Sequence, residues 1–130
     1  MTAPEIATEV VLVVEDETLV RMFAVDVLTD AGFKVEEACS AEEALAKAGA
    51  LRSKLRAALI DVGLPDRSGE DLAREVREID ASLPIVIASG RSEQELTQRF
   101  EANGQCAILA KPYTEQMLLD ALASVGVSVR

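Results

Sequence analysis

Short runs rich in Val, Ile and Leu alternate with longer amphipathic segments along the whole chain. The run Val10–Val14 (VVLVV) is almost wholly apolar, as in a strand that is covered on both faces of a sheet. Further apolar runs predict strands at Ala57–Val62, Pro84–Ala88 and Ala107–Ala110, and a shorter segment predicts one at Lys34–Ala38. The strand at Lys34–Ala38 is the one in which polar and apolar residues alternate.

A helical pattern follows each predicted strand. The segment Glu17–Ala31 ends before Gly32, a natural C-terminal stop, and Ser40 with Glu43 forms a capping box in which each side chain satisfies the other's backbone N–H. A second capping box, Ser92 with Glu95, starts a helix that stops at Asn103-Gly104. The expected inner faces are Val20, Phe23, Val27 and Ala31; Ala41, Ala44, Leu45 and Ala48; Leu72, Val76 and Ile79; Leu96 and Phe100; and Leu118, Ala121, Leu122 and Val125.

Five strands that each lead into a helix predict an α/β fold with a parallel sheet and helices on both faces. Right-handed crossovers leave few ways to wind such a sheet, and we expect the flavodoxin-like (βα)5 arrangement with strand order 2-1-3-4-5. The length of 130 residues fits one domain, with a folded core over about residues 9–126 and a short N-terminal extension.

The composition excludes several classes of function. The formal net charge of −10 argues against general binding to nucleic acid and against anionic membrane surfaces. No apolar run approaches the length of about 18 residues that a membrane span needs, and residues 1–9 carry no basic residue, unlike a secretory signal. We expect Cys39 and Cys106 to be small buried hydrophobic residues in a reducing cytoplasm. The chain has no histidine, so its chemistry must come from carboxylates, Lys, Ser or Thr.

Chemically active residues stand where the predicted strands end. The first strand is followed by Glu15-Asp16, the third ends at Asp61, the fourth is followed by Ser89-Gly90 and the fifth by Lys111-Pro112. In open α/β sheets the ligand site lies at the carboxyl ends of the strands, so these side chains should meet in one shallow cleft. Taken singly, each has an ordinary structural explanation as a helix cap, an ion-pair partner or a turn residue.

Three carboxylates brought together repel one another, so one must take up a proton or the group must bind a cation. Oxygen ligands without His or Cys favour Mg²⁺ or Mn²⁺ over zinc. A metal here, together with Lys111, would offset the charge of an incoming phosphoryl group. Asp61 beside that metal could then act as a nucleophile and form an acyl phosphate.

Over essentially its whole length, the sequence resembles the receiver domains of two-component response regulators, in the stand-alone single-domain form. The residues that carry the resemblance are Val10–Asp16 (VVLVVED), Leu59–Pro65 (LIDVGLP) with Gly69, then Ser89, and then Lys111-Pro112. The combination is specific, although each motif alone is weak.

The resemblance implies a role for each matching residue. Asp61 would be the phosphoacceptor, Asp16 a direct metal ligand, Glu15 a ligand through water, and the backbone carbonyl of Gly63 a further ligand. Ser89 would be the switch hydroxyl, Lys111 would pair with a phosphoryl oxygen, and the Lys111–Pro112 bond would be cis. The phosphoryl donor would be a sensor histidine kinase or a histidine phosphotransfer protein, and a downstream protein target would bind the modified form.

Two departures from the family pattern affect these expectations. Ile108 stands where the family often has a rotating Tyr or Phe, so an aromatic switch is not expected here. Gly90 replaces the commoner Ala after the switch hydroxyl, and the Ala-Ser-Gly turn resembles a subgroup with Ala-Thr-Gly-Tyr, although Arg91 replaces the Tyr. Gly63 and Arg91 flank the site at which the family tunes the lifetime of its phosphoryl group, so this lifetime does not follow from the resemblance.

Other functions compete with this interpretation. A receiver fold could bind partners without being phosphorylated. Metal binding would discriminate between this interaction module and a phosphoacceptor, because a site that does not bind Mg²⁺ would favour the interaction module. A phosphatase with an aspartyl intermediate would need a second Asp where Gly63 stands, and a flavin protein would need a phosphate loop where Glu15-Asp16-Glu17 would repel a phosphate. We do not expect this chain to be an enzyme with an external substrate; self-phosphorylation and autodephosphorylation are the only expected reactions.

Overall fold

A computed structural model describes residues 10–90 and 106–127. These residues form a five-stranded parallel sheet with the order β2-β1-β3-β4-β5, as predicted. The elements are β1 (Val10–Val14), α2 (Thr18–Asp30), β2 (Lys34–Ala38), α3 (Ala41–Leu51), η1 (Arg52–Lys54), β3 (Leu55–Asp61), α4 (Gly69–Ile79), β4 (Ile85–Ser89), β5 (Cys106–Ala110) and α6 (Glu115–Ser124). The expected N-terminal extension, and the helix expected between Ser92 and Asn103 with Arg91 before it, lie outside the described residues.

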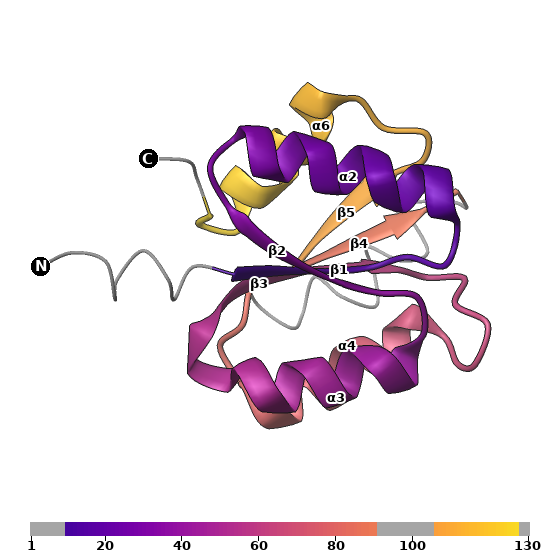
Figure 1. Cartoon of the computed structure of the whole chain (residues 1–130), viewed down its shortest axis with the longest axis vertical. Coiled ribbons are helices and arrows are strands. Elements are labelled where there is room, and N and C mark those ends of the chain that lie inside the picture. The colour runs from indigo at the N-terminus through magenta and orange to yellow at the C-terminus, as the bar shows by residue number, and fades with distance from the viewer. Residues whose placement is uncertain (1–9, 91–105, 128–130) are drawn as a thin grey trace, which may run out of the picture.

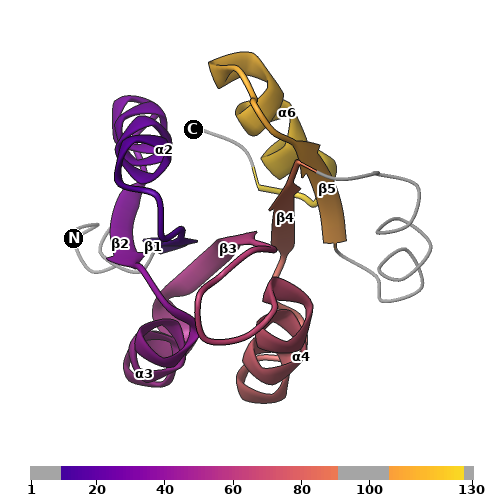
Figure 2. The same ribbon diagram turned by 90° about the vertical axis from the view of Figure 1, so that its right-hand side faces the viewer.

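Helices cover both faces of the sheet. Helices α2 and α6 lie on one face, and α3 and α4 lie on the other (Figures 1 and 2). Among the residues that the structure describes, no helix is both long enough and apolar enough to cross a bilayer.

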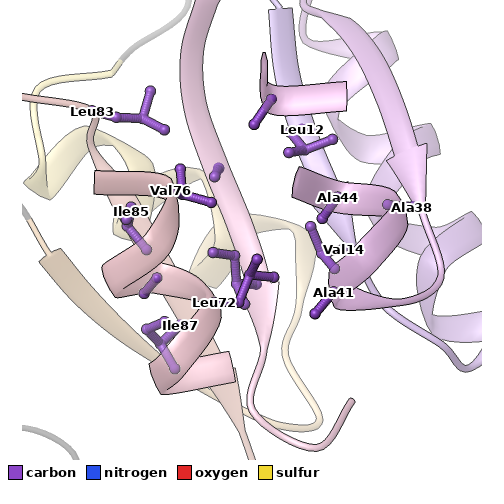
Figure 3. Packing of buried hydrophobic residues seen from close by; sticks show 14 of the residues in the cluster. Leu12, Val14, Ala38, Ala41, Ala44, Leu72, Val76, Leu83, Ile85 and Ile87 are labelled. Carbon is purple, nitrogen blue, oxygen red and sulfur yellow. The ribbon is translucent and has the colours of Figure 1, made fainter. Parts of the chain in front are cut away.

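Each face has its own hydrophobic core. Along β1, Val11 and Val13 contribute to the α2/α6 cluster, whereas Leu12 and Val14 contribute to the α3/α4 cluster, which Figure 3 shows. All five residues of β1 are buried, because alternate side chains point to opposite faces and both faces are covered. The apolar run that predicted a doubly covered strand is thus explained by the packing.

Strand positions follow the prediction to within two residues. The ranges of β1 and β2 agree with it, whereas β3 begins at Leu55 and ends at Asp61. The third strand therefore ends on the carboxylate itself. Since β3 lies between β1 and β4 in the sheet, Asp61 is placed at the centre of the carboxyl edge.

The expected inner face of α2 is partly wrong. The buried residues are Ala24, Val27 and Leu28, whereas Phe23 is 40% exposed. Ala24 faces the sheet in its place, and Phe23 lies at the edge, where the centroid of its ring is 5.9 Å from that of Tyr113. The inner faces of α3 and α6 are as predicted.

One of the two hydrogen bonds predicted for the capping box at the start of α3 is present. The Ser40 hydroxyl accepts from the Glu43 N–H, but the Glu43 carboxylate accepts from the N–H of Cys39 rather than that of Ser40. Cys39 is exposed and Cys106 is only partly buried, so neither is the fully buried residue that we expected.

Gly69 allows the loop between β3 and α4 to fold back beneath Asp61. Its N–H donates to the carbonyl of Val62 at 2.9 Å, and a Cβ at this position would overlap the Asp61 carbonyl oxygen and lie 2.8 Å from Cα of Val62. Backbone atoms cannot move aside as a flexible side chain can. This position therefore requires glycine because of space.

We expect Gly69→Ala to lower the free energy of unfolding by about 1–3 kcal/mol, the usual cost of overpacking, in urea denaturation followed by circular dichroism. The control is Gly49→Ala in α3, where a new Cβ has no atom within 4 Å. That substitution should be neutral or should stabilise by up to about 1 kcal/mol, because Ala has the higher helix propensity. Equal effects of the two substitutions would contradict the steric explanation.

Candidate functional site

The loop after β1 brings two carboxylates to the carboxyl edge of the sheet. Glu15 is buried, with 4% of its surface exposed, whereas Asp16 is exposed. The Glu15 N–H donates to the carbonyl of Ala38 at 3.0 Å, and its own carbonyl accepts from Nη1 of Arg21 at 2.8 Å. The backbone of Glu15 is therefore held by both β2 and α2.

Asp61 and Lys111 meet between β3 and the loop after β5. Asp61 is 6% exposed, and its Oδ1 lies 3.0 Å from Nζ of Lys111. The same ammonium group lies 3.1 Å from Oε1 of Glu15 and 3.6 Å from Oε1 of Glu17. One cation thus faces three carboxylates.

The carboxylates of Glu15, Asp16 and Asp61 each offer an oxygen, and these oxygens lie within 4.8 Å of one another. Oxygen-only ligand sets suit hard cations such as Mg²⁺ and Mn²⁺, and Mg²⁺ keeps several waters, which suits the exposed Asp16. The three residues expected to supply carboxylates are thus close enough to hold one divalent ion.

The electrostatics of the cluster follow from burial and proximity. Burial raises the pKa of Glu15, and the charge of Asp61 adds to this, against the opposing hydrogen bonds from the Glu17 N–H and Lys111. For Lys111, burial alone would lower the pKa, but its hydrogen bonds to Asp61 and Glu15 outweigh this and hold the pKa above its ordinary value. Lys111 is therefore charged, whereas burial, with a smaller contribution from the charge of Asp61, disfavours the ionised form of Glu15.

The other expected site residues lie around this cluster. Ser89 ends β4, is 2% exposed, and accepts through its backbone carbonyl from the N–H of Lys111 at 2.9 Å. Gly63 lies beside Asp61, since a Cβ there would be 3.8 Å from Oδ2 of Asp61. Gly90 and Pro112 are exposed at the same edge.

Two expectations taken from the resemblance concern the backbone and the core near this edge. The Lys111–Pro112 bond is cis, which confirms the first. Ile108 is partly buried and packs against the α3/α4 cluster, on the face of the sheet opposite to α2 and α6. An aliphatic side chain therefore fills the position at which the family often has an aromatic ring.

Sequence reasoning missed four residues that build the surroundings of the site. These residues are Glu17, Arg21, Asp66 and Tyr113. Burial raises the pKa of Tyr113 to about 12, with Glu15 contributing. The only sequence signal was the position of Glu17 and Tyr113 next to motif residues, whereas nothing in the local pattern marked Arg21 or Asp66.

An apolar groove of about 430 Å³ opens beside Lys111. It lies between the start of α2 and the loop after β5, and its lining residues are Glu17, Leu19, Val20, Phe23, Lys111, Pro112 and Tyr113. Leu19 is 80% exposed, so this side of the site presents hydrophobic surface. The carboxylate cluster therefore has an acidic centre with an apolar margin.

Comparisons with known proteins agree with the fold and identify the family. The family model described as "Response regulator receiver domain" matches residues 11–123. The chemotaxis protein CheY of Thermotoga maritima is 28% identical over 117 residues, which are 89% of this chain and 96% of CheY. The sensor kinase CckA of Brucella abortus is 33% identical over 108 residues, and the match spans 83% of this chain but only 11% of the kinase. The structure of CheY4 of Vibrio cholerae superposes with a TM-score of 0.81 at 32% identity, covering 90% of this chain and 98% of CheY4.

The raised pKa of Glu15 predicts that its ionised carboxylate destabilises the fold, and that this effect depends on pH. A carboxyl group whose folded pKa is raised contributes stability below its unfolded pKa of about 4.3, and this contribution is lost as the pH rises through the folded pKa. Without metal at pH 7, we therefore expect Glu15→Gln to melt a few degrees above the wild type, with the difference shrinking towards pH 4.

Differential scanning calorimetry between pH 4 and 8 measures this difference. The matched control is Asp26→Asn, which removes the same unit of charge from an exposed position on α2. A similar gain in both variants would mean that overall charge, and not the burial of Glu15 beside Asp61, is responsible.

Proposed function

The chain belongs to the response regulator receiver domain family, and on that premise we propose that Asp61 accepts a phosphoryl group with Mg²⁺ or Mn²⁺ bound beside it. Receiver domains are modules of two-component signalling rather than enzymes with an external substrate. The observation that carries the proposal is the position of Asp61, whose buried carboxylate lies close to two further carboxylates and 3.0 Å from the ammonium group of Lys111.

Asp61 supplies the nucleophile. One carboxylate oxygen attacks the phosphorus atom, a new O–P bond forms, and the bond from phosphorus to the donor breaks with its electron pair leaving on the donor. For a phosphohistidine donor, the leaving imidazole then takes up a proton; for a small acyl phosphate, a carboxylate leaves. The product is an acyl phosphate on Asp61, and no oxidant or other co-reactant is required.

The metal would be held by Asp61 and Asp16, by Glu15 through water, and by the carbonyl of Gly63. When bound, the ion would supply positive charge that offsets the repulsion among these carboxylates and the phosphoryl oxygens. The oxygen-only donors that lie within 4.8 Å of one another support this assignment.

Lys111 changes its partner during the reaction. It now pairs with Oδ1 of Asp61, and it would pair instead with a phosphoryl oxygen once Asp61 is modified. Ser89, at the end of the strand next to β3, would donate its hydroxyl to another phosphoryl oxygen. The backbone hydrogen bond from Lys111 to Ser89 couples these two residues, so a shift of one moves the other.

The modification changes partner binding through a shift between two packings of the fold. Ser89 and Lys111 are drawn towards the phosphoryl group, which displaces the backbone at Ser89-Gly90 and at Lys111-Pro112. With Ile108 in place of an aromatic ring, we expect the response to pass through these segments rather than through a rotating side chain.

The donor would be a sensor histidine kinase or a histidine phosphotransfer protein, and the modified chain would bind a downstream protein target. Support for a sensor kinase as donor comes from the similarity of this chain to part of a protein named as a sensor kinase, of which the chain spans 11%. The net charge of −10 disfavours nucleic acid and anionic membranes as partners, and we place the chain in the cytoplasm.

A second candidate function is an interaction module with the receiver fold that is never phosphorylated. Its apolar groove beside Lys111 would serve as a binding surface in its own right. The two functions differ in metal dependence, because only the phosphoacceptor needs a divalent cation at the carboxylates.

Incubation with a small acyl phosphate and Mg²⁺ tests the proposal. We expect intact-protein mass spectrometry to show the gain of one phosphoryl group, which is lost in Asp61→Asn and when a chelator is present. As a control, Asp80→Asn changes a carboxylate that lies beside β4 at the amino end of the strands, away from the site. A phosphoryl gain that survives Asp61→Asn, or no gain in the wild type, would refute the proposal.

A further inference from the structure

The loop between β3 and α4 is fastened to the N-terminus of another helix, α3. The two carboxylate oxygens of Asp66 accept from the N–H groups of Ala41 and Glu42, each at 2.9 Å. These are the first two residues of α3, whose N–H groups have no partner within the helix. A residue 25 positions further along the chain thus completes the cap of this helix.

Charge strengthens these contacts. The N-terminus of a helix carries partial positive charge, which favours an anion, and hydrogen bonds to a carboxylate are stronger than those between neutral groups. The same hydrogen bonds lower the pKa of Asp66 from its ordinary value. Asp66 is therefore ionised near neutral pH, and its contacts with α3 are maintained.

The loop that Asp66 fastens carries Gly63 past the Asp61 carboxylate. Gly63 is exposed and has no side chain to hold it, so its position depends on the residues around it in the loop. Before it, Asp61 is fixed as the last residue of β3. After it, Leu64 packs into the α3/α4 cluster, and Asp66 binds α3.

We propose that Asp66 is a positioning residue for the metal site: by binding the N-terminus of α3, it holds the loop so that the Gly63 carbonyl faces the carboxylates. This rests on the proposed function, because it assumes that the Gly63 carbonyl is a metal ligand. Residues that orient the ligands of a metal typically affect its affinity about 10–100-fold.

The coupling works in both directions. If the contacts of Asp66 with α3 favour metal binding, then bound metal favours those contacts by the same factor. The N–H groups of Ala41 and Glu42 should therefore exchange with solvent more slowly when Mg²⁺ is present. Metal binding at the carboxylates would therefore affect α3, although none of the expected metal ligands lies on that helix.

Isothermal titration calorimetry of the full chain with MgCl₂ measures the effect on Mg²⁺ affinity. We expect Asp66→Ala to weaken Mg²⁺ binding about tenfold, and Asp66→Asn to weaken it less, because one amide oxygen can still accept. The matched control is Ser40→Ala, which removes another cap of the same helix, the hydrogen bond from the Glu43 N–H at 3.2 Å, but leaves the loop fastened.

Ser40→Ala should lower the melting temperature while leaving Mg²⁺ affinity within about twofold of the wild type. Equal Mg²⁺ affinity in Asp66→Ala, Ser40→Ala and the wild type would overturn the role of Asp66 and leave the proposed function intact. A wild type that does not bind Mg²⁺ would overturn both. If Asp66→Ala does not fold, Asp66→Asn and the amide exchange of Ala41 and Glu42 in the wild type decide: exchange unaffected by Mg²⁺ would refute the coupling.

Discussion

Lys111 lies between two buried carboxylates, 3.0 Å from Asp61 and 3.1 Å from Glu15, which are 50 and 96 positions away in the chain. The parallel sheet forces this meeting, because the strands that carry these residues all end at the same edge. Burial makes the negative charges costly unless a cation is present. The ammonium group of Lys111 meets this need, because it pairs with both Glu15 and Asp61.

The backbone around these charges is held from several directions. Gly69 lets the loop after β3 pass directly beneath Asp61, and Arg21 binds the carbonyl of Glu15 from α2. Asp66 joins the same loop to α3. The backbone that carries these charged groups therefore contacts three helices in addition to the sheet.

Much of the fold could be predicted because its signals are local. The apolar run Val10–Val14 marked a doubly covered strand, and the alternation of strands with helices predicted the parallel sheet. Its order was expected from right-handed crossovers, which leave few ways to wind such a sheet, and the structure confirms it. Errors arose where two local choices were nearly equal. Phe23 was placed in the core because it is apolar and correctly spaced, but the helix turned the smaller Ala24 to the sheet. Glu43 found the N–H of Cys39 instead of that of Ser40, a difference of one residue in a capping turn.

The sequence by itself determined which residues stand at the strand ends, and therefore that Glu15, Asp16, Asp61, Ser89 and Lys111 would gather at one edge. The parallel direction of the strands suffices for this, because parallel strands carry their final residues to the same side. Only the tertiary structure decided which groups touch: that Lys111 pairs with both Glu15 and Asp61, that Gly69 leaves no space for a side chain, and that Asp66 caps α3. These contacts join segments far apart in the chain, and their distances depend on how the helices pack, which no local pattern encodes.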